Sequence, residues 1–209
     1  MSQTTVKPVK PVKPIVDLNF PYFSLVARLR LGRALWLTGA LLALGLEMFS
    51  VLYFQQSLGL RPCLYCVYIR QGALLIAIGA FWAAILPQWV IFRLPGHLLS
   101  LAGSLVVIIY AFELEVLNAR ALHWPQAYAP CGARPGLALG RWLARKWPGH
   151  FSPQGDCGVD SNWSFGSFNM AELLLVSFIL VFCALVVGLG AGIYQRSLTG
   201  QWPFEASAR

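Results

Sequence analysis

Four long stretches of apolar residues constrain the fold of this chain more than any other feature of its sequence. They cover residues 34–54, 67–86, 94–112 and 170–193. Each has about 20 residues, the length that an α-helix needs to cross a hydrocarbon core of about 30 Å. Only 11% of the 209 residues are charged, whereas soluble domains average about 25%. The sequence therefore predicts an all-α membrane protein, a bundle of four transmembrane helices.

Basic residues gather ahead of the first stretch, between Lys7 and Arg33. The positive-inside rule assigns this end to the cytoplasm, and four spans return the C-terminus to the same side. We therefore expect a cytoplasmic tail over 1–33, a membrane domain over 34–195 in contact with membrane lipid, and a second cytoplasmic tail over 196–209. Because this placement accounts for the net charge of +8, no nucleic acid is expected as a partner.

The longer of the two external loops on this topology covers about 116–168. It is far too long for a simple turn, and loops of this length usually carry function. Apolar residues recur in it at helical spacing: Leu139, Trp142, Leu143 and Trp147. This pattern predicts a short amphipathic helix on the outer membrane surface, with its Trp side chains at headgroup level. The alternative is a soluble mini-domain that packs the same Trp side chains inward.

Cys63 and Cys66 form a C-x-x-C motif at the external end of the second stretch. Two thiols three positions apart at a helix start can close a small ring. The unpaired backbone amides there stabilise a thiolate and lower its pKa toward neutrality. The spacing therefore predicts a reactive disulfide rather than a structural one.

Two further cysteines, Cys131 and Cys157, lie 26 positions apart in the long loop. They can form a structural staple, as is common in external loops. A zinc site made of all four thiols is weaker, because zinc ribbons pair two C-x-x-C motifs and this chain has one; no metal is expected. Four cysteines allow three pairings, so the resting pairs stay open. The fifth, Cys183 in the fourth stretch, is expected to be a small buried apolar residue.

Two charged residues fall inside the apolar stretches. Arg70 lies one helical turn beyond Cys66, and a permanent cation at such a depth is costly and is a functional candidate. The alternative is an arginine that reaches the outer headgroups, but directly beneath a C-x-x-C motif we favour a role in holding an electron acceptor. Glu47 is either charged or protonated and bonded to a neighbouring helix. Small residues in the fourth stretch predict a close approach of helices: Gly188, Gly190 and Gly192.

In combination these features resemble the disulfide bond formation protein B (DsbB) family, over roughly residues 31–195. The resemblance rests on the four spans, the C-x-x-C motif at the head of the second span, the arginine four residues beyond it and a second cysteine pair in a long loop. The residues that carry it are Pro62-Cys63-x-x-Cys66, Arg70 and Gly155-Asp156-Cys157, together with Glu47, Phe54-Gln55 and Trp163.

The resemblance implies an enzyme of the bacterial inner membrane, a thiol:quinone oxidoreductase that reoxidises a periplasmic DsbA-like thiol oxidase. The reduced partner would attack Cys131 to form a mixed disulfide, which Cys157 resolves. The Cys63–Cys66 disulfide would then reoxidise the loop pair. Through Cys66 two electrons would pass to ubiquinone or menaquinone, which Arg70 would bind.

The family also contains DsbI-like members that serve a dedicated oxidase, so the resemblance leaves the identity of the partner open. A vitamin K epoxide reductase-like protein is an alternative, but there the C-x-x-C motif comes late in the bundle, after the loop pair, the reverse of the order here. A non-catalytic scaffold with a stapled loop leaves Arg70 and the C-x-x-C motif unexplained.

Overall fold

A computed structural model describes residues 33–86, 89–123, 138–155, 164–165 and 168–199. The tails at 1–32 and 200–209, and the loop cysteines Cys131 and Cys157, lie outside the described residues. The predictions made for them therefore stay predictions.

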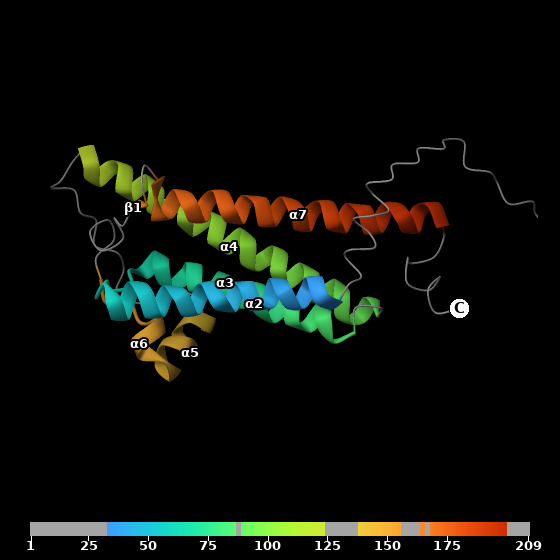
Figure 1. The fold of residues 1–209 in the computed structure, drawn as a ribbon, viewed down its shortest axis with the longest axis horizontal. Coiled ribbons are helices and arrows are strands. Elements are labelled where there is room, and N and C mark those ends of the chain that lie inside the picture. Colours follow the sequence, from blue (N-terminus) through green and yellow to red (C-terminus); the bar gives the residue numbers. More distant parts are fainter. Residues whose placement is uncertain (1–32, 87–88, 124–137, 156–163, 166–167, 200–209) are drawn as a thin grey trace, which may run out of the picture.

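Four long helices form the body of the molecule (Figure 1). They are α2 (Arg33–Phe49), continued by the π-helix η1 (Ser50–Ser57), then α3 (Leu64–Ile85), α4 (Val90–His123) and α7 (Met170–Thr199). Each contains a segment long and apolar enough to cross a membrane. The predicted all-α membrane class and the four spans are confirmed, and α2 begins at the same end of the molecule as α7 finishes.

The third membrane-spanning helix, α4, runs further than the sequence predicted. We expected it to close at Phe112, before Glu113 and Glu115, but α4 continues to His123. Glutamate is a good helix former, so two acidic residues do not by themselves end a helix. The external loop consequently starts about two turns later than predicted.

The start of α7 is fixed by a reciprocal cap. Asn169 Oδ1 accepts a hydrogen bond from the Glu172 backbone N–H at 2.8 Å, and Glu172 Oε2 accepts one from the Asn169 N–H at 2.9 Å. The Asn169 side chain also donates to Glu115 Oε2 at 2.8 Å. These bonds tie the beginning of α7 to the extended end of α4.

Glycines allow α3 and α4 to touch along their backbones. A Cβ atom added to Gly79 would lie 2.6 Å from the Gly96 carbonyl oxygen, and one added to Gly103 would lie 2.6 Å from that of Gly72. Only glycine permits so close an approach. The close approach predicted for α7 is wrong for Gly190, which has nothing within 4 Å of such a Cβ.

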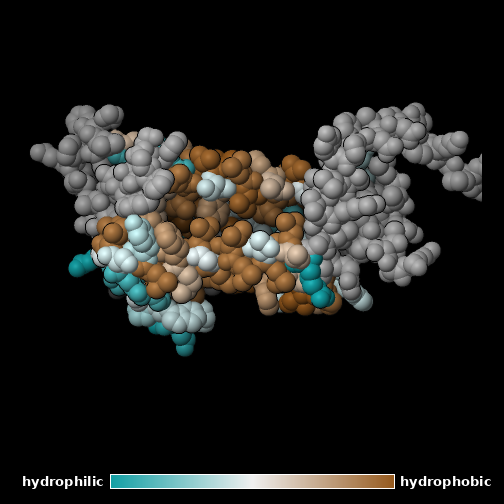
Figure 2. Space-filling view, in the orientation of Figure 1, coloured by the Kyte–Doolittle hydropathy of each residue, from teal (hydrophilic) through white to brown (hydrophobic). Residues whose placement is uncertain are grey.

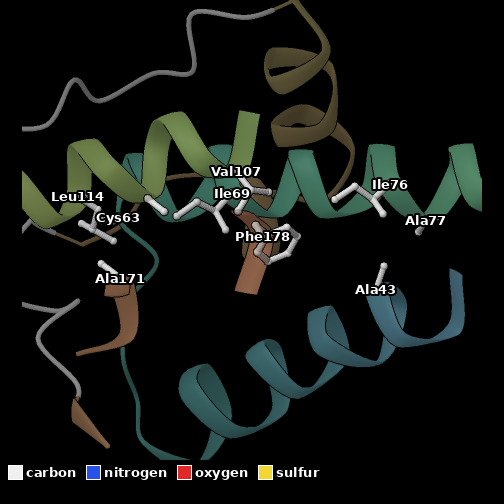
Figure 3. Close-up of a cluster of buried hydrophobic side chains, with 10 residues drawn as sticks. Ala43, Cys63, Ile69, Ile76, Ala77, Val107, Leu114, Ala171 and Phe178 are labelled. Carbon is white, nitrogen blue, oxygen red and sulfur yellow. The ribbon is translucent and has the colours of Figure 1, made fainter. Parts of the chain in front are cut away.

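The buried core joins all four long helices near the C-x-x-C end of the bundle. Figure 3 shows Phe178 of α7 beside Ile69 of α3 and Val107 of α4, with Ala43 contributed by α2. The outer surface is reversed relative to a soluble protein, since Leu41, Ile91 and other large apolar residues are exposed on it. Figure 2 shows this apolar surface between the two ends, as expected for contact with lipid.

Two short helices and a small hairpin complete the described chain. They are α5 (Ala138–Lys146), α6 (Pro148–Phe151) and the antiparallel strands β1 (Ser164–Phe165) and β2 (Phe168–Asn169). The amphipathic helix is confirmed: Leu143 of α5 and Phe151 of α6 are buried against Val67 of α3. Trp142 and Trp147 are exposed, 46% and 52%, so inward packing of these side chains is wrong. Their contact with headgroups stays a prediction.

Candidate active site

The C-x-x-C motif sits at the start of α3, as predicted. Cys63 is the N-cap of the helix and has an extended backbone, while Cys66 lies in the first turn. The Cys63 sulphur accepts a hydrogen bond from the Cys66 N–H at 3.2 Å, and the two sulphur atoms lie 2.7 Å apart. Because the backbone already holds both thiols together, they can exchange between dithiol and disulfide by side-chain movement alone.

The two cysteines differ in their surroundings. Cys63 is fully buried, whereas Cys66 is partly exposed and lines a cavity. The hydrogen bond to the Cys66 sulphur raises the pKa of the Cys63 thiol above its ordinary value, and burial raises this pKa further. The backbone amide at the helix start acts in the opposite direction but is outweighed. The pKa near neutrality expected from the helix start is therefore wrong for Cys63.

Arg70 is buried and joins three elements of the fold. Its Nη2 donates to Ser50 Oγ of η1 at 3.1 Å, and its Nη1 donates to the His150 carbonyl oxygen of α6 at 3.0 Å. Its Nε lies 3.6 Å from Glu47 Oε1 of α2, in an ion pair whose side chains are 6% and 14% exposed. Arg70 therefore does not reach toward headgroups, and Glu47 is bonded to a neighbouring helix.

A cavity of about 440 Å³ lies beside these residues. It is lined by the end of α2, η1, the start of α3 and the start of α7. Figure 2 shows the apolar face hollowed between α2 and α7. Its walls are mainly apolar, with side chains that include Phe49, Phe54, Ile69, Leu174 and Phe178. Its polar lining consists of Glu47, Ser50, Gln55, Arg61, Arg70 and Ser177, together with Cys66. Apolar walls with a few convergent polar groups are typical of a small-molecule site of this size.

The segment that precedes Cys157 is anchored beside the C-x-x-C motif. The backbone N–H groups of Gln154 and Gly155 both donate to the carbonyl oxygen of Pro62, at 2.9 Å and 3.2 Å. Pro62 directly precedes Cys63 in the chain. This part of the long loop is thus held next to the first cysteine pair.

Two further expectations from the sequence concern the burial of Cys183 and the alternative of a zinc site. Cys183 is exposed on α7 rather than buried, so that prediction is wrong. The described residues contain no cluster of three His, Cys, Asp or Glu that could hold a metal ion, whereas the four-thiol zinc alternative involves two cysteines outside them.

Some of the residues that line the cavity were not predicted from the sequence. Ser50 follows Glu47 by three positions, the spacing that puts two side chains on one face of a helix, and this signal could have found it. Phe178 gives no comparable signal, because almost every residue around it is apolar.

Comparison with known proteins identifies the family of this chain. The model of the family described as disulfide bond formation protein DsbB matches residues 32–196. The chain belongs to the DsbB family.

The names of curated relatives support the assignment of this chain to the DsbB family. The disulfide bond formation protein B of Mannheimia succiniciproducens is 35% identical over 156 residues, covering 74% of this chain and 84% of the relative. The protein-disulfide oxidoreductase DsbI of Lelliottia amnigena is 33% identical over 150 residues, covering 69% and 67%. The chain is accordingly a protein-disulfide oxidoreductase and a multi-pass membrane protein. The vitamin K epoxide reductase-like and scaffold alternatives are set aside.

Proposed function

We propose that this protein is an inner-membrane thiol:quinone oxidoreductase that reoxidises a periplasmic DsbA-like thiol oxidase and passes two electrons to ubiquinone or menaquinone. The observation that carries the proposal is that Cys66 and Arg70 line the same apolar cavity inside the membrane domain. A redox-active sulphur and a fixed cation thus face one site that is suited to an apolar electron acceptor.

The residues of the cavity fit a quinone. A quinone has a flat ring and an apolar tail, which suit the aromatic and aliphatic walls, and its two oxygens need hydrogen-bond donors. Arg70 supplies such donors, and its positive charge stabilises the negative charge that develops on an oxygen during reduction. Bound there, a quinone supplies a two-electron acceptor. Ser50 and His150 hold the Arg70 guanidinium in place before it acts.

The cysteines divide the exchange reactions between them. A thiol of the reduced partner attacks Cys131 of a Cys131–Cys157 disulfide, which forms a mixed disulfide and releases the Cys157 thiol. The second thiol of the partner then attacks the mixed disulfide, so the partner leaves oxidised and the loop pair stays reduced. The anchoring of Gln154 and Gly155 to Pro62 supports exchange between Cys157 and the neighbouring Cys63. Cys66, which lines the cavity, is then the sulphur from which the electrons leave.

The topology follows from the charges of the sequence. The basic residues before α2 keep both termini in the cytoplasm, so the C-x-x-C motif and the long loop face the periplasm. A DsbA-like partner reaches the loop cysteines from that side. The electrons then pass from the periplasmic surface into the cavity.

A quinone-reduction assay tests the proposal. The purified full-length protein is mixed with a reduced thioredoxin-like donor and a short-chain ubiquinone analogue, and the quinone absorbance is followed. Cys66→Ala should reduce the rate to the uncatalysed background, because it removes the sulphur beside the cavity. The matched control is Cys183→Ala, which removes an exposed thiol outside the cavity and should keep the wild-type rate. Full activity of Cys66→Ala would refute the proposal, as would folded wild-type protein that consumes neither ubiquinone nor menaquinone analogues.

A further inference from the structure

The cavity contains one carboxyl group among the described residues that line it. Four of these residues carry titratable side chains: Glu47, Arg61, Cys66 and Arg70. An arginine side chain does not release a proton in proteins, and the Cys66 sulphur is itself oxidised when the S–S bond forms. Glu47 is therefore the lining residue that can release and regain a proton while its own oxidation state is unchanged.

The redox reaction needs such a group. When the Cys63 and Cys66 thiols form their S–S bond, two electrons and two protons are released. Reduction of a quinone to a quinol consumes two electrons and two protons, one proton at each oxygen. The electrons leave from a sulphur atom in the cavity wall, but the surrounding apolar side chains cannot carry protons. The protons need a titratable residue or water within the cavity.

We propose that Glu47 delivers one of these two protons. Its carboxylate, paired with Arg70 at rest, takes up a proton that the cysteine pair releases, passes this proton to the nearer quinone oxygen and returns to the ion pair. The second quinone oxygen takes its proton from water, and the cysteine pair releases its second proton to water, so that protons and electrons balance. This inference rests on the proposed thiol:quinone activity and assigns Glu47 a role within the same site.

The contacts of Glu47 suit this role. Its Oε1 lies 3.6 Å from Arg70 Nε, and the other two nitrogens of the Arg70 guanidinium are held by Ser50 and His150. The carboxyl group therefore faces a cation that cannot swing away. Glu47 remains 14% exposed and lines the cavity, so its carboxyl group is open to a ligand there.

The charged and titratable groups around Glu47 come from one side of the cavity. α3 contributes Arg70 and Cys66, and the connection before α3 contributes Arg61. The α7 residues that line the cavity carry no charge: Met170, Leu173, Leu174, Ser177 and Phe178. As negative charge develops on an acceptor beside Arg70, this cation is shared between two negative groups, which favours protonation of the Glu47 carboxylate. The acceptor oxygen becomes more basic at the same time, which favours passing the proton on to it.

A purely structural role for Glu47, as the counter-ion that holds Arg70, makes different predictions. The test compares Glu47→Gln, which keeps the size of the side chain but cannot carry a proton, with Glu47→Asp, which keeps a carboxyl group. The matched control is Ser50→Ala, which removes another contact of Arg70 from the same cavity wall. Each full-length variant is assayed for equilibrium binding of a ubiquinone analogue, and for its rate of reduction against pH, in D₂O, and with added acetic acid.

We expect Glu47→Gln to bind the analogue much as wild type does but to reduce it about 10²-fold more slowly, the usual size of a general-acid contribution. Acetic acid should restore part of this rate, and Glu47→Asp should keep most of the activity. Ser50→Ala should weaken binding, keep the shape of the wild-type pH profile and show no response to acetic acid.

Several results would overturn the assignment. If Glu47→Gln loses binding in proportion to rate, without acid rescue and with an unchanged pH profile, Glu47 is only a counter-ion. If Glu47→Gln does not fold, infrared difference spectra of the wild type decide. A protonated-carboxyl band that changes on reduction, and that is shifted in Glu47→Asp, supports the role, and the lack of such a band refutes it. Folded wild-type protein that reduces no quinone would instead refute the proposed function.

Discussion

At the scale of single residues, the two cysteines of the C-x-x-C motif have separate surroundings. Cys63 caps α3, is fully buried and is hydrogen bonded to Cys66, whereas Cys66 opens to the cavity. A thiolate is the form of cysteine that attacks readily. This asymmetry therefore makes Cys63 the less reactive sulphur in the reduced protein.

The raised pKa of Cys63 predicts slow alkylation in the reduced protein. Near about pH 8, Cys63 should be alkylated more slowly than a free cysteine of pKa about 8.5, and the rate should increase as the pH is raised further. In Cys66→Ala the hydrogen bond that chiefly raises this pKa is lost, so Cys63 should react faster at the same pH. Pulsed alkylation followed by mass spectrometry measures both rates. A Cys63 thiol that reacts fully below neutral pH would contradict the account.

The sequence identified the chemical groups of the described site better than their contacts. Cys63, Cys66, Arg70 and Glu47 stand out because ionisable or paired thiol residues are rare in apolar stretches. The bond from Arg70 to His150 could not be predicted, since it ends on a backbone carbonyl 80 positions away. No side-chain pattern marks such an acceptor.

At the scale of helices, the contact between α3 and α4 depends on glycines. Gly72 and Gly79 in α3, and Gly96 and Gly103 in α4, are each seven residues apart and meet in antiparallel order. This contact holds α3 firmly against α4, and α3 carries the C-x-x-C motif and Arg70. The geometry of the site therefore depends on helix packing well away from it.

This dependence predicts different effects for two glycine substitutions. Gly96→Ala should lower the free energy of unfolding by about 1–3 kcal/mol, because the new Cβ would lie 2.5 Å from the Gly79 carbonyl oxygen. Gly190→Ala has open space around it and should be neutral, or stabilising by up to about 1 kcal/mol through helix propensity. Unfolding of the purified protein in mixed detergent measures both. Equal effects of the two substitutions would show that the α3–α4 contact is not a close one.

Helix existence was predictable and helix ends were less so. Length and hydropathy define the spans, because the membrane imposes both. The end of α4 depends instead on propensity and on the bond between Glu115 and Asn169, two residues that lie 54 positions apart. The π-helix η1 follows no pattern in the sequence, although such widened turns are frequent at functional sites.

At the scale of the whole molecule, the active groups gather at one end of the bundle. The C-x-x-C motif, α6, η1 and the start of α7 meet there, and the cavity separates η1 from α7. The long loop is anchored at this end through Pro62. On the proposed function, thiol exchange would take place at this end of the bundle, and the electrons would enter the membrane-spanning helices through Cys66.

The proposed quinone site is tested by finding where a quinone binds on the protein. A photoreactive ubiquinone analogue is added to the full-length protein, activated by light, and the labelled peptides are identified by mass spectrometry. We expect labels on residues 46–55 and 170–178, two of the walls of the cavity, and their loss when unmodified analogue is present in excess. Specific labelling around Trp36 and His97 instead, with the cavity walls unlabelled, would contradict it.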